Sequence, residues 1–106
     1  MQQPAPSADD GKDATMASTF HLSILTPEKA VYSGDVEYVQ VPGSEGYLGV
    51  LAHHAALVTA LAAGDLTVRR PGAADEKLAV SGGFFEVSNN SATVLADGVT
   101  GNLGGA

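Results

Sequence analysis

The chain has 106 residues, 12 acidic against 5 basic side chains, a formal net charge of −7 and a hydrophobic content of 44%, which fits one domain with a packed core. The sequence has no cysteine, which excludes disulfides, a thiolate nucleophile and cysteine-ligated zinc. The acidic balance argues against nucleic acid as a partner, because phosphate binding needs clustered Lys and Arg. The longest mostly apolar run, residues 55–63, is far shorter than the roughly 20 residues that cross a bilayer, so we expect no direct membrane insertion.

Residues 1–19 are predicted to be a disordered acidic N-terminal tail or extension. This stretch is rich in proline, glycine and aspartate and has hardly any bulky apolar side chain to offset the entropy cost of ordering it. It lacks the apolar stretch of a secretory signal and the arginine content of a transit peptide. Met16 offers an alternative start, which leaves open whether residues 1–15 are native.

From residue 20 onward the pattern is typical of an all-β domain. Phe20, Leu22 and Ile24 alternate with His21 and Ser23, which places the apolar side chains on one face of a strand. Similar short runs follow, separated by Gly, Pro, Asn and Asp at intervals of roughly ten residues. The predicted strands cover residues 20–25, 29–33, 36–41, 47–51, 57–61, 65–70, 76–80, 84–88 and 91–95. Strands with one apolar face must bury those faces against one another, which predicts a β-sandwich or a flattened barrel.

Two turns are predicted from their residue types. Asn89 and Asn90 lie between two predicted strands, and Asn tolerates the positive φ angles of a type I′ hairpin. Gly82 and Gly83 directly precede two phenylalanines, where they supply the backbone freedom for a tight corner. Residues 50–63, by contrast, are rich in alanine and leucine, so intrinsic propensity alone predicts a helix there.

The histidines do not form a convincing metal site. His53 and His54 are adjacent, and adjacent residues on a strand point to opposite faces, so the two rings could not share one ion. The third histidine, His21, has no carboxylate at ligand spacing. We therefore expect no metal, and we favour an interface histidine over a small histidine-metal barrel enzyme of the cupin kind.

Other catalytic motifs are incomplete. Ser81 lies outside any Gly-x-Ser-x-Gly elbow, and the loop 43–46 lacks the Gly-Lys-Ser/Thr ending of a phosphate loop. The acidic residues are scattered rather than paired for acid–base work. These are Glu28, Asp35, Glu37, Asp75 and Asp97. The sequence thus predicts no catalytic residue and no cofactor, and favours a protein that presents surfaces to partners.

A series of ordered segments resembles a known family. They are residues 20–28 (FHLSILTPE), 32–36 (YSGDV), 41–59 (VPGSEGYLGVLAHHAALVT), 64–66 (GDL), 79–87 (AVSGGFFEV) and 92–97 (ATVLAD). In order and spacing they resemble the N-terminal domain of the epsilon subunit of F-type ATP synthases, whose mitochondrial equivalent is called delta. The resemblance implies an all-β fold, a flattened antiparallel β-sandwich of about ten short strands in two sheets over residues 20–97. It also replaces the helix at 50–63 by a strand.

The resemblance implies a mechanical function rather than an enzymatic one. It implies a non-catalytic central-stalk (rotor) subunit of a proton-translocating ATP synthase, which couples rotation of the c-ring to the catalytic head. The residues that match the gamma-subunit interface are His54, Ala55 and Thr59. Those that match the contact with the polar loops of the c-ring are Ser44, Glu45, Gly46 and Tyr47. Such a subunit is peripheral on the cytoplasmic face of the bacterial inner membrane, and we expect a monomer when it is isolated.

The sequence departs from the family at its C-terminus. After Asp97 the chain ends in the glycine-rich residues 98–106, so we expect a flexible tail with no inhibitory or ATP-binding helices. Ala56 also stands where many relatives have proline. The alternative function is a free-standing β-sandwich binding module, which would need an aromatic platform or a pairing edge strand. The only candidates for such a platform are three tyrosines, Tyr32, Tyr38 and Tyr47.

Overall fold

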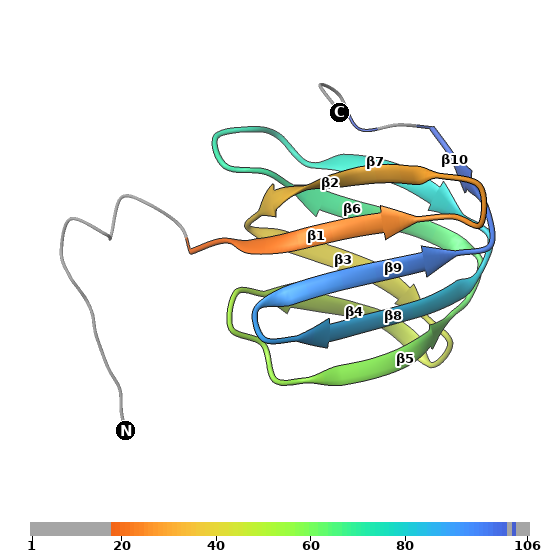
Figure 1. Ribbon diagram of the computed structural model, residues 1–106, viewed down its shortest axis with the longest axis horizontal. Coiled ribbons are helices and arrows are strands. Elements are labelled where there is room, and N and C mark those ends of the chain that lie inside the picture. The colour runs from red at the N-terminus through yellow and green to blue at the C-terminus, as the bar shows by residue number, and fades with distance from the viewer. Residues whose placement is uncertain (1–17, 102, 104–106) are drawn as a thin grey trace, which may run out of the picture.

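The computed structural model describes residues 18–101 and residue 103, a region with ten strands and no helix (Figure 1). The strands are β1 (Phe20–Leu25), β2 (Ala30–Val36), β3 (Tyr38–Gly43), β4 (Gly46–Leu51), β5 (Leu57–Leu61), β6 (Gly64–Arg69), β7 (Glu76–Val80), β8 (Gly83–Ser88), β9 (Ser91–Ala96) and β10 (Val99–Thr100). Each predicted strand overlaps an observed one. Most of the predicted N-terminal tail, residues 1–17, and residues 102 and 104–106 of the predicted C-terminal tail lie outside the described residues.

The strands form two layers that face each other (Figure 1). One layer has the order β5-β8-β9-β1-β2, and the other contains β4, β3, β6, β7 and β10. All neighbours are antiparallel except β1 and β9, which run parallel and pair residue 21 with residue 91. A single bridge between Gly43 and Leu61 joins the layers. The predicted flattened β-sandwich is confirmed, and its two layers are parts of one folded sheet.

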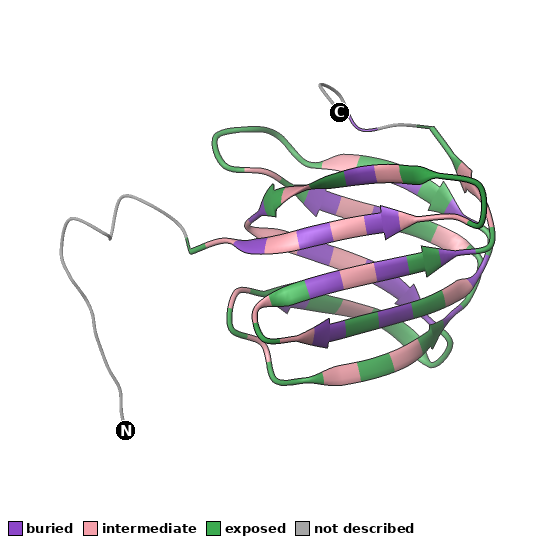
Figure 2. Ribbon diagram, viewed as in Figure 1, coloured by how far each residue is buried: buried purple, intermediate pink, exposed green. Residues whose placement is uncertain are grey.

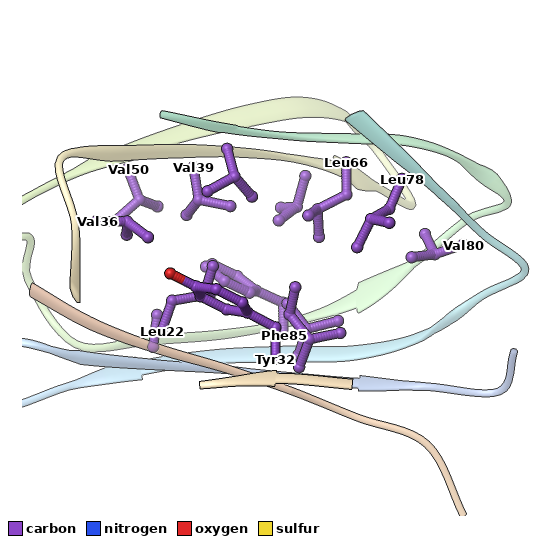
Figure 3. Close-up of a cluster of buried hydrophobic side chains, with 14 of the residues drawn as sticks. Leu22, Tyr32, Val36, Val39, Val50, Leu66, Leu78, Val80 and Phe85 are labelled. Atoms are coloured by element: carbon purple, nitrogen blue, oxygen red, sulfur yellow. The ribbon is translucent and has the colours of Figure 1, made fainter. Parts of the chain in front are cut away.

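The core lies between the two layers and is apolar. Buried and exposed residues alternate along most strands, so each strand turns one face inward (Figure 2). Val39, Leu66 and Leu78 project from one layer toward Leu22 and Phe85 of the other (Figure 3). No polar or charged residue of the described chain is buried. The domain is therefore held by apolar packing and by the hydrogen-bonded ladders of the sheet.

The alanine-rich segment is strand and turn rather than helix. It forms the end of β4, a turn at residues 52–53, and β5, which pairs with β8 along its whole length. Leu61, at the end of β5, is buried in the core. Pairing and burial outweigh a helix propensity that differs among ordinary residues by less than about 0.7 kcal/mol each.

The predicted turn residues have unusual backbone angles. Asn89 and Asn90 have φ angles of 52° and 59°, as a type I′ turn requires. Gly82 and Gly83 have φ angles of 122° and 134°, which L side chains rarely adopt. A Cβ atom on Gly83 would overlap the carbonyl oxygen of Leu95. Glycine at position 83 therefore allows β8 to approach β9 closely.

The chain beyond residue 97 contains structure that the sequence did not predict. Val99 and Thr100 form β10, which pairs with Val80 and Ala79 of β7. Leu103 is only 2% exposed, and Val99 packs against the core. Pairing with β7 and two apolar side chains thus hold the described part of this glycine-rich segment on the sandwich.

Candidate functional site

The first candidate surface is the tip of the β3–β4 hairpin, residues 44–47, which we call the hairpin tip. Gly43 pairs with Gly46, so Ser44 and Glu45 form a two-residue turn, and all four residues of the hairpin tip are exposed. The backbone N–H of Ser44 donates a hydrogen bond to the carbonyl of Ala60 at 2.9 Å. This bond ties the hairpin tip to β5.

Tyr47 fixes the other side of the hairpin tip. Its hydroxyl accepts a hydrogen bond from the backbone N–H of Asp65 at 3.4 Å, although the residue is 58% exposed. A Cβ atom on Gly64 would lie 3.0 Å from this hydroxyl and 2.9 Å from Cβ of Pro42, so the tyrosine hydroxyl lies close against a glycine of β6. Glu45 has no hydrogen-bond or ion-pair partner among residues 18–101 and 103. The hairpin tip therefore presents a free carboxylate from an anchored backbone.

The second candidate surface is the loop of residues 52–56 between β4 and β5. His53 has a φ angle of 64°, and its backbone N–H donates to the side-chain oxygen of Asn90 at 2.7 Å. The amide nitrogen of Asn90 donates to the carbonyl of Thr19 at 2.9 Å. Asn90 thus links the 52–56 loop to the β8–β9 turn and to the start of β1. Sequence reasoning treated this residue only as a turn former.

His54 and Ala55 lie together in this loop, and Thr59 lies apart from them. The His54 ring nitrogen Nδ1 is 2.7 Å from the carbonyl oxygen of Ala55 and donates to it when it carries the proton. Thr59 is paired with the buried Phe85, so its side chain is on the inward face of β5. Among the described residues, no three or more His, Cys, Asp or Glu are grouped so that they could hold a metal ion.

An exposed apolar strip was missed by the sequence analysis. Val58 is 69% exposed, Phe84 57% and Leu95 46%, all on the outer face of the β5-β8-β9-β1-β2 layer. We define the apolar strip as these three residues together with Ala60 and Leu25. The pairing register places Ala60 opposite Phe84, Phe84 opposite Leu95, and Leu95 opposite Leu25.

The apolar strip had a signal in the sequence. Phe84 and Phe85 are consecutive, and on a strand one of two consecutive residues must face outward. Beside Phe84 and Leu95 the surface has a depression of about 270 Å³, which Leu25 and Pro27 also line. Large contiguous apolar patches are rare on the surfaces of monomeric proteins and often mark protein–protein contact sites. The strip is therefore a candidate protein-binding surface in its own right.

The arginines are engaged at the β6–β7 hairpin. Arg69 forms an ion pair with Asp75 at 2.7 Å, and Arg70 forms one with Glu76 at 2.7 Å. The hydrogen bond from Arg69 lowers the pKa of Asp75 and in turn raises the pKa of Arg69. Arg69 also lies 5.2 Å from the ring centre of Tyr38. These charges support the hairpin rather than a site for an anionic ligand.

Comparison with known proteins identifies the family. The family described as "ATP synthase, Delta/Epsilon chain, beta-sandwich domain" matches residues 19–101. This chain belongs to that family. The epsilon chain of Desulforamulus reducens is 52% identical over 82 residues, which cover 77% of this chain and 61% of that protein. The epsilon chain of Rhodopseudomonas palustris (strain TIE-1) is 49% identical over 83 residues, which cover 78% of this chain and 61% of that protein. The chain thus spans 61% of the length of these epsilon-chain relatives.

Solved structures agree with this delta/epsilon assignment at the level of the fold. A chain of the Euglena gracilis mitochondrial ATP synthase (OSCP/F1/c-ring) matches with a TM-score of 0.74 at 21% identity, over 93% of this chain and 71% of that one. A chain of the Tetrahymena thermophila mitochondrial ATP synthase (central stalk/c-ring) matches with a TM-score of 0.65 at 17% identity, over 78% of this chain and 66% of that one. The part of the chain that the structure describes has no helix long and apolar enough to cross a membrane.

Proposed function

We propose that this epsilon-family sandwich is a non-catalytic central-stalk subunit of a proton-translocating F-type ATP synthase. In this role it binds the gamma subunit and the polar loops of the c-ring, and so couples rotation of the ring to the catalytic head. It works as a peripheral subunit on the cytoplasmic face of the bacterial inner membrane. Family membership supports the assembly, and the separation of the hairpin tip from the 52–56 loop by the length of β4 supports the coupling role.

The apolar strip is the observation that carries the proposal. An acidic domain with no buried polar residue in its described part still exposes Phe84 directly opposite Leu95, and Val58 lies on the same outer face, diagonal to Phe84 across β5 and β8. We propose that gamma covers this strip and extends past Val58 to the 52–56 loop with His54 and Ala55. Thr59 would then support the gamma-binding face from the inner side of β5 instead of touching gamma with its full side chain.

The hairpin tip is proposed as the contact with the c-ring. It lies at one end of β4 and the 52–56 loop at the other, and a strand of six residues spans about 20 Å. The hairpin tip is therefore well separated from the 52–56 loop, whereas it meets the apolar strip at Ala60, whose carbonyl accepts the hydrogen bond from Ser44. The free carboxylate of Glu45 would favour docking against cationic loops on the ring, chiefly through orientation and association rate.

Co-expression with the gamma subunit of the same organism, followed by size-exclusion chromatography, tests the gamma contact. Wild type is expected to elute as a stoichiometric complex with gamma. Val58→Arg and Phe84→Glu are expected to lose it, because each places a charge in the buried centre of the interface. We prefer these variants to Thr59→Arg, which would force a charge against Phe85 and confuse unfolding with loss of binding.

Ala79→Arg is the matched control. Ala79 is an exposed strand residue of β7, in the other layer, so an arginine there is expected to leave the complex intact. A complex that survives both strip variants would refute gamma binding at this surface. If wild type failed to bind gamma under all conditions, a free-standing binding module would become the better assignment.

A further inference from the structure

A serine, a histidine and an aspartate converge on the outer face of β1 and β2. The His21 ring nitrogen Nε2 lies 2.9 Å from Oγ of Ser33, and its other nitrogen, Nδ1, lies 3.6 Å from Oδ1 of Asp35. The pairing register accounts for this arrangement, because His21 is opposite Asp35 and the next outward pair joins Ser23 to Ser33. The cluster lies outside the hairpin tip, the 52–56 loop and the apolar strip.

The order of atoms in the cluster is that of an activated nucleophile. Nε2 can accept the Ser33 hydroxyl proton only when the neutral ring carries its own proton on Nδ1. The carboxylate of Asp35 lies on the Nδ1 side and favours this tautomer. Ser33, His21 and Asp35 are therefore arranged as nucleophile, general base and orienting group.

The cluster is open to solvent. Ser33 is exposed, the His21 side chain is 44% exposed and that of Asp35 is 70% exposed. β2 is also the last strand of its layer, so one side of Ser33 has no neighbouring strand. A small reagent can reach the hydroxyl, but an open surface holds no substrate for repeated turnover. Such a geometry suits a single covalent modification rather than an enzyme active site.

We propose that Ser33 is a site of covalent acylation by activated esters, with His21 as the general base and Asp35 as a positioning residue. Oγ of Ser33 attacks the ester carbonyl carbon while Nε2 of His21 takes the hydroxyl proton. The tetrahedral intermediate then collapses, the bond to the leaving alkoxide or phenolate breaks, and an ester remains on Ser33. His21 afterwards releases its proton to water, so the reaction needs no further reagent.

The test is site-resolved acetylation of the purified full chain with p-nitrophenyl acetate at pH 8. Peptide mass spectrometry follows the acetyl occupancy of Ser33 and of Ser81 with time. Ser81 is the internal reference, because it is also exposed but its hydroxyl donates to the carbonyl of Gly98 at 3.4 Å instead of to a histidine. We expect Ser33 to react about tenfold faster than Ser81. This rate enhancement is smaller than that usually contributed by a general base positioned in an active site.

Variants separate the role of each group. His21→Gln keeps a polar side chain next to Ser33 but removes the base, and it is expected to lower the Ser33 rate to that of Ser81. Asp35→Asn is expected to lower the Ser33 rate several-fold and leave Ser81 unchanged, which a general loosening of the fold would not do. Equal rates at Ser33 and Ser81 in wild type would overturn the proposal without any variant. So would a His21→Gln variant that acetylates Ser33 at the wild-type rate.

Discussion

Gly83 should be one of the least replaceable residues of the sandwich, and Gly72 provides a matched comparison. Both have positive φ angles, 134° at Gly83 and 72° at Gly72. A Cβ atom on Gly72 would meet nothing within 4 Å. On Gly83 it would overlap the carbonyl oxygen of Leu95 and lie 2.9 Å from Cα of Ala96. The two alanine variants therefore differ chiefly in whether β8 must move away from β9.

The expected magnitudes follow from these contacts. Gly72→Ala places alanine in the left-handed region, which costs about 1–2 kcal/mol, and the stiffer unfolded chain returns about 0.4–1 kcal/mol of that. Gly83→Ala forces alanine into a backbone conformation that is nearly restricted to glycine, which costs about 1–3 kcal/mol of stability. The overlap of its Cβ atom with Leu95 costs about 1–3 kcal/mol more. We therefore expect Gly83→Ala to lower the free energy of unfolding by about 3 kcal/mol or more.

Thermal and urea denaturation followed by circular dichroism measure this difference. For a domain of this size, about 3 kcal/mol corresponds to a fall in Tm of roughly 12–24 °C, against a few degrees for Gly72→Ala. The fall should appear in the urea midpoint as well, with little change in the slope m. If Gly83→Ala were within about 1 kcal/mol of Gly72→Ala, the close approach of β8 to β9 would not constrain this position as we argue.

Three further variants test other parts of the structure. Asn90→Ala should lower the free energy of unfolding, measured by urea denaturation, by about 1–3 kcal/mol more than Asn89→Ala. Both variants keep a strained φ, but only the Asn90 side chain forms hydrogen bonds with the backbone of His53 and Thr19. Equal losses would mean that these hydrogen bonds contribute nothing to stability. Asp75→Asn should lower Tm at pH 7. Because the ion pair with Arg69 holds the pKa of Asp75 in the folded state below its usual value of 3.8, the difference in Tm from wild type should disappear as the pH falls below 3.8. A difference that persists at lower pH would contradict the ion pair. Glu45→Lys should weaken assembly with the c-ring and reduce its dependence on salt. Asp35→Lys, an exposed carboxylate at the opposite end of the sandwich, is the control, and an unchanged salt dependence for Glu45→Lys would exclude charge steering by the hairpin tip.

The strands were predictable because each carries its own evidence of a buried face. Phe20, Leu22 and Ile24 occupy alternate positions, and in the sandwich all three are buried. The paired asparagines likewise specify their hairpin locally, through the φ angles that they tolerate. The strand at residues 57–61 is different, since its local propensity favours a helix. Only the likeness to a known family predicted it, because the pairing with β8 that stabilises it lies outside the local sequence.

The candidate sites depend on register between distant strands, which short-range patterns do not contain. Phe84 faces Leu95 and Leu95 faces Leu25 only because β9 lies between β8 and β1. The Ser33–His21–Asp35 cluster arises in the same way from the pairing of β1 with β2. The contact of the Tyr47 hydroxyl with Gly64 and Asp65 also joins two strands that are not consecutive in the chain. Predicting each of these features requires knowing which strands pair with one another. A single sequence shows only which face of each strand is apolar.

The parallel pairing of β1 with β9 has a consequence for how the chain is made. Of the described strands, β1 is synthesised first, yet its place in the layer is between β2 and β9, and β9 is nearly the last of them to be synthesised. Until β9 has been synthesised, the apolar face of the β1–β2 hairpin is uncovered and the backbone N–H and C=O groups along the free edge of β1 have no strand to pair with. Native pairing over such sequence distances is slow, and an exposed edge of this kind can pair with other chains. The nascent chain therefore completes its fold only when its last strands are free, and the stalled or truncated chains that lack β9 are the ones most exposed to aggregation.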